Sequence, residues 1–375
     1  MTDGIWVALY ADASRVRKVQ ESFSKGKAIY RFGGKRAGVP PGPMKMTSCL
    51  GVSMVNFLSL SMNKIRSGIV GVGHIGKFHS RIYSELATAG ETDFTAIYDT
   101  NFENAKEVAD QYGAQATATL EEFATLVDCA SVATPTPFHF DTAQFLLNRG
   151  IHLLIEKPIT ETTEQAQQLV ALALEKKLIL QVGHVERFNP VMAVLEKHLN
   201  HPRFIEAHRL SPYPNRSVEI GVVLDLMIHD LEVILHLIKS PIKSVDAVGI
   251  PVLSKREDIA NARIRFENGS VANVTASRIS PEKMRKLRVF QEDAYLSLDY
   301  GEQSGEIFRK DGFQIVREVV PIERDDALTR QLQSFLICAQ KGIQPRVSGN
   351  QAAAALELAI RITHEIESSP FAESL

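Results

Sequence analysis

Three side chains in this 375-residue sequence have the types and the setting for proton transfer. Asp225 and His229 are four residues apart in the apolar stretch "LDLMIHDLEVILHL", so a helix would carry both on one face. Histidine suits proton transfer near neutral pH, because its unperturbed pKa is about 6.5. Lys157 precedes a proline, which disfavours the helical region and holds the lysine backbone extended. A lysine fixed in this way in a cleft can stabilise negative charge that develops on a reacting oxygen.

A glycine-rich turn is the second feature with chemical meaning. In "GVGHIG" the glycines have the G-x-G-x-x-G spacing. The first allows a sharp exit from a strand, the second lets the backbone approach a pyrophosphate, and the third lets the helix pack closely on the strand. A β-branched run precedes the turn and helical spacing follows it, which predicts a dinucleotide site. The residues expected beside the cofactor phosphates are Gly71, Gly73, His74, Ile75 and Gly76.

Asp99, at the end of the next apolar strand, sets the expected choice of cofactor. It lies near the ~20-residue spacing at which an acid bonds the adenosine ribose hydroxyls. A carboxylate there repels a 2′-phosphate, and no arginine follows it at position 100 or 101, so the sequence favours NAD over NADP. A cation from a neighbouring loop would still allow NADP. A turn aspartate at a strand end is the structural alternative.

The pattern of strands and helices shows how these residues are positioned. Between residues 62 and 184, short apolar strands alternate with helical segments, which predicts a parallel sheet covered on both faces. After Val185, strand-like runs follow one another, and "ENG" at Glu267–Gly269 indicates a tight hairpin. We therefore predict an α/β fold with an N-terminal Rossmann domain over residues 62–184. A C-terminal α/β domain with an open, mostly antiparallel sheet would follow over residues 185–375, for substrate binding and oligomerisation. Whether its last helices pack back on the first domain stays open.

Residues 1–61 carry no helical or strand period, and "GGKRAGVPPGP" within them is typical of a linker. Methionines at several positions offer alternative starts, so we expect the working protein to begin near Met62. The part before it would be an extension or a start-site artefact. The stretch from Cys49 to Met62 imitates a signal-peptide core, but it lies far from the N-terminus and lacks a clear cleavage site.

Composition narrows the classes of function. The net charge of −2 gives no basic field for a nucleic-acid partner. Three scattered cysteines are too few for a disulfide framework or a zinc site, so we expect no metal and a reducing cytoplasm. Spanning a bilayer takes roughly 20 consecutive apolar residues. Because the sequence has no apolar run of that length, we expect no membrane insertion.

Two further stretches end neighbouring strands: "VATPTPFH" (Val132–His139) and "EKPIT" (Glu156–Thr160). Open α/β sheets bind ligands beyond the carboxyl ends of their strands, where both stretches lie. Together with the glycine turn they resemble the glucose–fructose oxidoreductase/inositol dehydrogenase (Gfo/Idh/MocA) family, from about Lys64 to the C-terminus. The resemblance implies NAD(P)-dependent oxidation or reduction of a sugar-like alcohol. The residues that we expect beside the cofactor here are Thr134, Pro135, Thr136, His139, Glu156 and Lys157.

The family resemblance also implies catalytic roles for Lys157, Asp225 and His229. We expect His229 to take the hydroxyl proton while hydride leaves carbon for the nicotinamide, and Asp225 to orient the imidazole. Lys157 would hold the substrate oxygen, and it is the competing candidate for the base. A protein that binds NAD and a partner without turnover is the non-enzymatic alternative, against which the presence of all three residues argues. Asp230 and His236 lie on other helix faces, and we interpret both as structural or surface residues.

Two further stretches bear on the identity of the substrate. "GHVERFNP" (Gly183–Pro190) and the stretch Ser277–Tyr300 resemble the branch of the family that contains UDP-N-acetylglucosamine 3-dehydrogenases, whose 3-keto product is aminated on the way to lipid A. The substrate contacts expected are Lys157, Arg187, Arg278 and His229. A local cationic cluster suits a UDP pyrophosphate, although a solvated strand edge explains it equally well. Its members are Arg278, Lys283, Arg285, Lys286 and Arg288.

Alternatives to a nucleotide sugar stay open at this point. A free polyol or inositol is the second candidate substrate, and relatives that cleave glycosides with transiently reduced NAD carry motifs of the same kind. We also expect a homo-oligomer, a dimer or a tetramer, in which the open sheet face pairs subunits as it does in the family.

Overall fold

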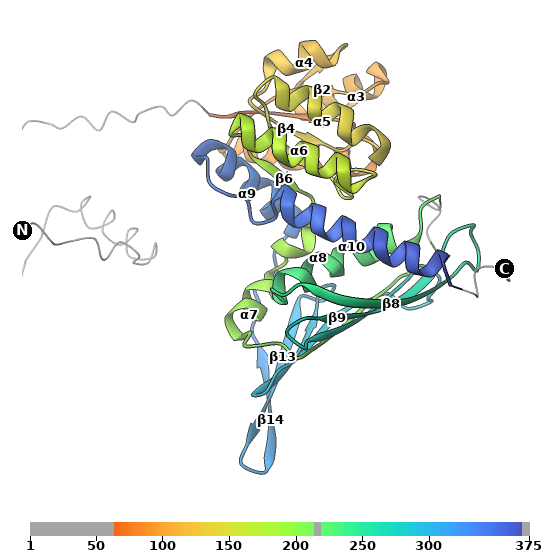
Figure 1. The fold of residues 1–375 in the computed structure, drawn as a ribbon. Coiled ribbons are helices and arrows are strands. Elements are labelled where there is room, and N and C mark those ends of the chain that lie inside the picture. The colour runs from red at the N-terminus through yellow and green to blue at the C-terminus, as the bar shows by residue number, and fades with distance from the viewer. Residues whose placement is uncertain (1–63, 214–218, 370–375) are drawn as a thin grey trace, which may run out of the picture. The chain divides into compact units, whose positions relative to one another are not determined.

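The computed structural model describes residues 64–213 and 219–369. The extension expected over residues 1–61 and the start expected near Met62 lie outside these ranges. Within them, a six-stranded sheet and an eight-stranded sheet follow each other along the chain (Figure 1).

The first sheet has the strand order β3-β2-β1-β4-β5-β6, and its pairings are parallel. Strand β4 is buried along its whole length, as a strand covered on both faces must be. From β1 the chain builds the sheet outward to β3 on one side, and from β4 it builds outward to β6 on the other. In sheets of this kind, ligands bind in the crevice between the two strands at which the direction changes, here β1 and β4. The strands are β1 (Arg66–Val70), β2 (Asp93–Tyr98), β3 (Gln115–Thr117), β4 (Cys129–Val132), β5 (His152–Ile155) and β6 (Leu180–Val182). The parallel Rossmann sheet predicted from the sequence is confirmed.

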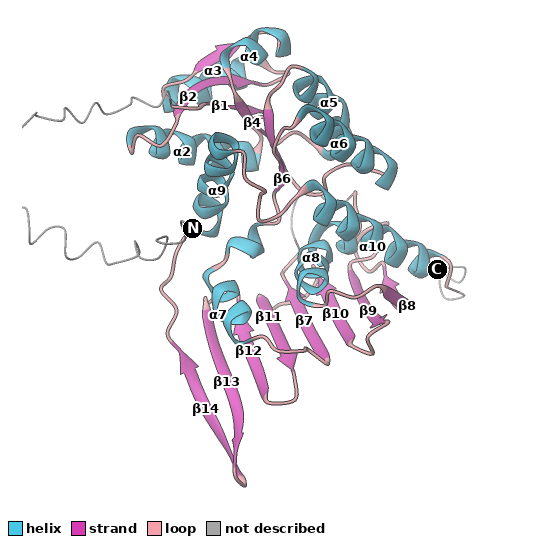
Figure 2. Cartoon of the chain, turned by 60° about the vertical axis from the view of Figure 1, so that its left-hand side comes forward, coloured by secondary structure: helices cyan, strands magenta, loops and turns pink. Residues whose placement is uncertain are grey.

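Helices cover both faces of this sheet, and Figure 2 shows α2 and α9 on one side with α5 and α6 on the other. Side chains of α2, α3 and α9 form one apolar cluster, and those of α5 and α6 join a second one. Local signals fix their starts: Asn101 caps α3, and Thr162 with Gln165 forms a capping box at α6. The helices are α2 (His74–Thr88), α3 (Phe102–Tyr112), α4 (Leu120–Leu126), α5 (His139–Asn148) and α6 (Thr163–Lys176), with a 3₁₀ turn η1 (Thr136–Phe138) before α5.

The second sheet has the order β14-β13-β12-β11-β7-β10-β9-β8. Only β7 and β10 pair in parallel among its described strands, so the open, mostly antiparallel sheet is confirmed. Burial alternates along β7 and β9 through β12, because one face packs on helices. The strands are β7 (Phe204–Leu210), β8 (Ile242–Ile250), β9 (Ile259–Phe266), β10 (Val271–Ser277), β11 (Met284–Phe290), β12 (Ala294–Asp299), β13 (Ser304–Asp311) and β14 (Gln314–Val320). Gly269 has φ 84° in the hairpin predicted between β9 and β10.

Three helices of the second half, α7, α8 and α10, pack against this sheet. The helix expected to carry Asp225 and His229 begins with a single π turn, η3 (Val223–Met227), and continues as α8 (Ile228–Leu237). Helix α9 packs against α2 and η2, and α10 packs against both α6 and α8, so the last two helices contact both halves. The remaining elements are η2 (Val185–Phe188), α7 (Pro190–His198), α9 (Ala327–Lys341) and α10 (Gly349–Glu367). In the described ranges, none of the helices combines the length and apolar character that crossing a bilayer requires.

Candidate active site

The glycine turn has the geometry of a pyrophosphate cradle. Gly71 has φ 89°, and a Cβ there would lie 2.9 Å from the backbone of Ala133, so only glycine fits. A Cβ at Gly76 would collide with the carbonyl oxygen of Gly71. By contrast, Gly73 is exposed and has nothing within 4 Å of its Cβ position. The space beside Gly73 is therefore open to a ligand.

The start of helix α2 supports the same interpretation. Gly73 is the N-cap residue, and no side chain caps the free backbone N–H groups of the first turn. That turn carries no acidic residue. Unpaired N–H groups and the positive end of the helix dipole suit a phosphate. His74 is exposed and Ile75 is half-buried at this point.

Asp99 follows β2 and faces the glycine turn. Its Oδ2 accepts a hydrogen bond from the Val72 N–H at 2.8 Å, and its Oδ1 accepts one from the Asn101 N–H at 2.9 Å. Each oxygen retains a lone pair for a hydroxyl donor. Asp99 is therefore tied to the glycine turn, with acceptor capacity left for a ligand hydroxyl.

The loops after β4 and β5 form the opposite wall. Pro135 is exposed, Thr136 opens the turn η1, and the hydroxyl of Thr134 is enclosed without a protein partner among the described residues. His139 lies below them and is 1% exposed. Its ring nitrogens contact the carbonyl oxygens of Thr134 at 2.8 Å and Pro158 at 2.9 Å. His139 was expected at the cofactor, but it ties the two loops together instead.

Glu156 also lies behind the cofactor wall. Its Oε1 lies 3.4 Å from Nε2 of buried His79. The same carboxylate packs against Gly183, where a Cβ would clash with it. The structure thus gives Glu156 a packing partner on two sides, and its expected contact with the cofactor stays a prediction.

Lys157 and Asp225 join the two halves of the chain. The lysine Nζ donates to the Asp225 carbonyl oxygen at 2.7 Å and to its Oδ1 at 3.1 Å. Both side chains are about one-fifth exposed, at 19% and 21%. We expected Asp225 to orient the imidazole of His229, but in the described part of the chain its carboxylate bonds Lys157 instead. The reason is local: Asp225 lies in the π turn η3, where the α-helical four-residue spacing no longer applies.

His229 lies at the start of α8, partly exposed, while its Nδ1 is enclosed and has no partner in the described ranges. Burial, followed by the positive charges of Lys157 and Arg209, holds its pKa well below the usual value. The imidazole is therefore neutral near pH 7 and can accept a proton.

A second histidine, His184, packs edge-on against His229, with ring centroids 5.9 Å apart and an interplanar angle of 82°. It is 1% exposed, and neither of its ring nitrogens has a partner among the described residues. Burial and the cations Lys157 and Arg187 lower its pKa to about 3. His184 lies within "GHVERFNP", but no spacing rule links it to His229, so its place in the site could not be predicted from the sequence.

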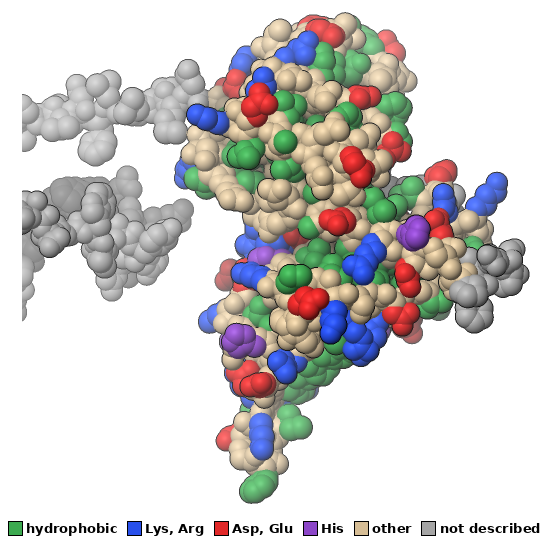
Figure 3. All heavy atoms as spheres, in the orientation of Figure 1, with side chains coloured by type: hydrophobic (Ala, Val, Ile, Leu, Met, Phe, Trp, Pro, Cys, Tyr) green, Lys and Arg blue, Asp and Glu red, His purple; other side chains and the backbone are tan. Residues whose placement is uncertain are grey.

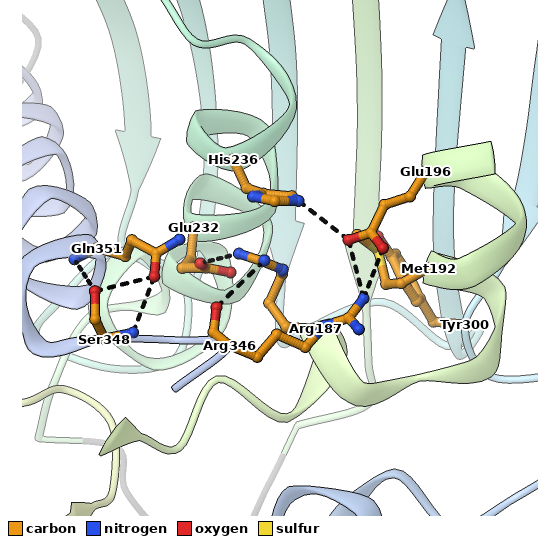
Figure 4. Close-up of polar contacts among 9 residues, drawn as sticks. All are labelled: Arg187, Met192, Glu196, Glu232, His236, Tyr300, Arg346, Ser348 and Gln351. Carbon is orange, nitrogen blue, oxygen red and sulfur yellow. Dashed lines mark hydrogen bonds and ion pairs between the residues drawn. The ribbon is translucent and has the colours of Figure 1, made fainter. Parts of the chain in front are cut away.

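Arg187 was expected to bind substrate, and the structure corrects this. It is 2% exposed, and its Nη1 donates to Glu232 Oε1 at 2.6 Å (Figure 4). His184 and Arg187 are three residues apart, as are their partners His229 and Glu232. The pair Arg187–Glu232 therefore lies one turn beyond the histidine pair and fixes η2 against α8.

The same region continues toward the surface in a second carboxylate cluster. Figure 4 shows Glu196 between Arg346 and His236. Arg346 Nη2 donates to both Glu196 oxygens at 2.9 Å, and the His236 ring nitrogen contacts Oε1 at 3.1 Å. His236 thus has a structural role, as interpreted from the sequence.

Arg278 was also expected at the substrate, and it is fully buried. Its Nε donates to Asp258 at 2.8 Å, and its Nη1 donates to the Ile220 carbonyl oxygen at 2.7 Å. Ile220 precedes the π turn that carries Asp225. Arg278 therefore anchors the chain where it enters that turn.

A buried ion network underlies the site. Arg209 donates to Asp230 at 2.7 and 3.1 Å and to Glu186 at 2.9 Å, and all three are almost completely buried. Charged pairs of this kind compensate each other for lost hydration. The network connects β7, η2 and α8 directly under His229. Sequence spacing gave no signal for it, because its members come from three distant segments.

Together these contacts connect the loops beside the glycine turn with the segment that carries the proton-transfer groups. Lys157 comes from the carboxyl end of β5, where the cofactor wall lies, and it reaches Asp225 on η3. Such an arrangement can hold a ligand hydroxyl between a cation and a neutral imidazole. That is the chemistry of alcohol oxidation coupled to a dinucleotide.

Comparisons with known proteins agree with this geometry. Residues 65–184 match the family described as "Oxidoreductase family, NAD-binding Rossmann fold", and residues 193–297 match the "GFO/IDH/MocA C-terminal domain". The UDP-N-acetylglucosamine 3-dehydrogenase of Acidithiobacillus ferrooxidans is 36% identical over 312 residues, which cover 80% of this chain and 98% of that protein.

Two further comparisons place the chain among dehydrogenases. A solved structure of the same Acidithiobacillus ferrooxidans enzyme superposes with a TM-score of 0.77 at 34% identity, covering 81% of this chain and 98% of that one. The inositol 2-dehydrogenase of Rhizobium meliloti is 25% identical over 317 residues, with 79% of this chain and 94% of that protein covered.

Proposed function

The chain belongs to the GFO/IDH/MocA family of NAD-binding oxidoreductases, and from that premise we propose that it oxidises a secondary alcohol of a nucleotide sugar. The observation that carries the proposal is that Lys157, at the end of β5, bonds Asp225 on η3 and, together with burial, lowers the pKa of His229. UDP-N-acetylglucosamine, oxidised at its 3-hydroxyl, is the substrate that the 36% identical relative suggests.

In the proposed mechanism, the bound nicotinamide supplies the hydride acceptor. Lys157 donates a hydrogen bond to the substrate oxygen and stabilises the negative charge that develops there. Asp225 holds the lysine ammonium by two bonds, so the cation keeps one direction during the reaction. His184 is buried and excludes water from the side of the His229 ring that it packs against.

We assign the proton acceptor to His229. Its lowered pKa keeps the ring neutral, so it can take the hydroxyl proton without first losing one. A protonated ring beside Lys157 is disfavoured, which promotes release of the proton after each turnover. Lys157 is the competing base, but its ammonium already donates hydrogen bonds to the carboxylate and the carbonyl oxygen of Asp225.

We propose NAD rather than NADP as the cofactor. The carboxylate of Asp99 bonds the backbone of the glycine turn, and the 2′-phosphate of a dinucleotide bound at that turn would meet its negative charge. We also propose a reducing cytoplasm as the location, since Cys129 and Cys338 are both buried free thiols.

We propose a homo-oligomer that pairs through the open sheet face. Four aromatic rings form a continuous row across it, with centroid distances of 5.5, 4.5 and 5.0 Å between successive rings. They are Phe204, Phe290, Tyr295 and Phe308. Beside them, the hairpin β13–β14 extends beyond the rest of the sheet and exposes Phe313 at its tip (Figures 1 and 2). A second copy of the chain would bury this apolar surface.

A substrate panel tests the proposed reaction. The protein is incubated with NAD and, separately, with UDP-N-acetylglucosamine, N-acetylglucosamine and myo-inositol, while absorbance of the reduced cofactor is recorded. We expect reduction with the nucleotide sugar. Turnover with inositol alone would support the second candidate, a polyol dehydrogenase, which the Rhizobium meliloti relative favours. No reduction with any secondary alcohol would contradict the proposal.

A further inference from the structure

Strand β11 carries three cations, Arg285, Lys286 and Arg288, and the pleat divides them between two faces. Arg288 points to the open face, where its Nη1 donates to Glu206 Oε2 of β7 at 2.9 Å. Lys286, two residues away, shares that face. Arg285 shares the opposite face with Leu287 and Val289, which are completely buried under the helices. Arg285 is thus the strand's cation on the catalytic side.

Arg285 differs from the other arginines on that side in its exposure. The side chains of Arg209 and Arg278 are 4% and 0% exposed and have partners inside the protein. The Arg285 side chain is 43% exposed. Its contact with Glu186 Oε1 is long, at 3.6 Å, and no hydrogen bond of its guanidinium is found in the described residues. Several of its five donors therefore remain available to a ligand.

The position of Arg285 is nevertheless fixed with respect to the reacting groups. Its Nη1 lies against Glu186 on η2, and Glu186 is held by Arg209, which in turn holds Asp230 next to His229. The Arg285 carbonyl oxygen accepts a bond from the Tyr300 N–H at 2.8 Å, which fixes its backbone. The charge of Arg285 also contributes to lowering the pKa of His229, so the two groups face the same region.

We infer that Arg285 recognises a phosphate of the substrate, and that the cleft beyond His229 is built for a sugar carrying a diphosphate. The inference rests on the proposed function and adds the residue that selects a charged substrate over a free sugar. A guanidinium offers parallel N–H donors that match two phosphate oxygens. Glu186 holds the guanidinium of Arg285 in position but leaves most of its hydrogen-bond donors unused.

Binding of UDP and uridine to the protein saturated with NAD tests the inference, because the two ligands differ by the diphosphate alone. Calorimetry is carried out on the wild type, R285Q, R285K and R288Q. Arg288 is the matched control, since it lies three residues away on the opposite face and has its own carboxylate partner. We expect the wild type and R288Q to bind UDP more tightly than uridine. In R285Q the affinity for UDP should fall about 10- to 100-fold, with uridine unchanged. R285K should lie between them, since it keeps the charge and loses the fork.

Equal affinities for UDP and uridine in the wild type would overturn the inference, and so would an unchanged UDP affinity in R285Q. Thermal unfolding checks that R285Q is folded, which we expect because Arg209 still holds Glu186 at 2.9 Å. The turnover assay separates this inference from the proposed function. If the wild type oxidises UDP-N-acetylglucosamine and R285Q does so with the same KM, the reaction stands and the role of Arg285 is wrong. If UDP binds through Arg285 but no alcohol is oxidised, the phosphate site stands and the proposed reaction is wrong.

Discussion

At the scale of single residues, charge and burial around the site divide the polar side chains into two groups. Lys157, Asp225 and His229 retain some exposure toward the cleft. Arg187 and Arg278 are buried in ion pairs and serve the framework. A sequence shows that an arginine is present, but its partner decides whether it meets a ligand or a carboxylate of the same chain.

Removing either proposed catalytic group should reduce turnover far more than cofactor binding. For His229→Phe and Lys157→Met we expect kcat to fall by about 10²- to 10⁴-fold, because each loses proton transfer or charge stabilisation. Binding of reduced cofactor, followed by fluorescence, should change little. His236→Phe, on the same helix but bonded to Glu196, is the control. Full activity in both H229F and K157M would refute the assigned roles.

His184 should make the protein less stable in mild acid. Its folded pKa is about 3, so between pH 6.5 and 3 the unfolded chain binds a proton that the folded chain does not. Stability is then complete above pH 6.5 and is lost as pH falls, by about 1.4 kcal/mol per pH unit from this group. Glu232, with its pKa raised to about 7, acts in the opposite direction between pH 4.5 and 7.

The measurement is therefore a difference between variants. Urea unfolding of the wild type and His184→Phe is compared at pH 7 and pH 5. We expect the wild type to lose about 2 kcal/mol more than H184F over this range, since phenylalanine fills the space without titrating. An equal change in unfolding free energy between pH 7 and pH 5 in the two proteins would show that His184 is not buried in its neutral form.

At the scale of elements, two features determine the site: the turn between β1 and α2, and the contact of η2 with α8. The turn depends on its glycines, because a side chain at Gly71 or Gly76 would clash with neighbouring backbone. The second depends on paired residues at matching positions along both segments, His184 with His229 and Arg187 with Glu232.

The glycine turn allows a test that separates binding from folding. Gly73→Ala adds a methyl group where the protein leaves open space, so we expect unchanged stability and about tenfold or greater loss of NAD affinity. Gly76→Ala places the same methyl group against the Gly71 carbonyl, and we expect it to destabilise the fold by about 1–3 kcal/mol. Thermal unfolding and NAD titration check both variants. Unaltered NAD binding in G73A would place the cofactor elsewhere.

The Arg187–Glu232 pair should contribute to the fit of η2 on α8. Arg187→Met leaves a carboxylate buried without its cation, and we expect a loss of about 3–5 kcal/mol in unfolding free energy. Adding Glu232→Met should recover most of that loss, because the pair is then replaced by apolar groups. Denaturant unfolding of both single variants and the double variant measures the coupling. Equal losses in R187M and the double variant would mean that the pair has no specific role.

At the scale of the whole molecule, the described chain forms two sheets, and we propose that the first binds the cofactor and the second the substrate. Figure 3 shows acidic and basic side chains interspersed over the face that it draws. The outer face of the second sheet differs, since it presents the aromatic row and the exposed hairpin.

This outer face should determine the oligomeric state. Tyr295 lies in the middle of the aromatic row, stacked on Phe290 at 4.5 Å and Phe308 at 5.0 Å. Tyr295→Glu introduces a charge there, and we expect sedimentation velocity to show a shift to a smaller species. Leu174→Glu changes an isolated exposed residue on α6 and should leave the sedimentation coefficient unchanged. Identical behaviour of the two variants would place the subunit contact elsewhere.

The sequence alone determined both sheets, the glycine turn, the acid after β2 and the residues Lys157, Asp225 and His229, because each is encoded by short-range spacing or by a family motif. Local rules could not find the partners that fold in from distant segments. The tertiary structure decided that Asp225 bonds Lys157, that His184 joins His229, that Arg187 and Arg278 are buried, and that the Arg285 side chain stays 43% exposed. The physical reason is that desolvated charges must be paired wherever packing brings them together, and packing is a property of the whole chain.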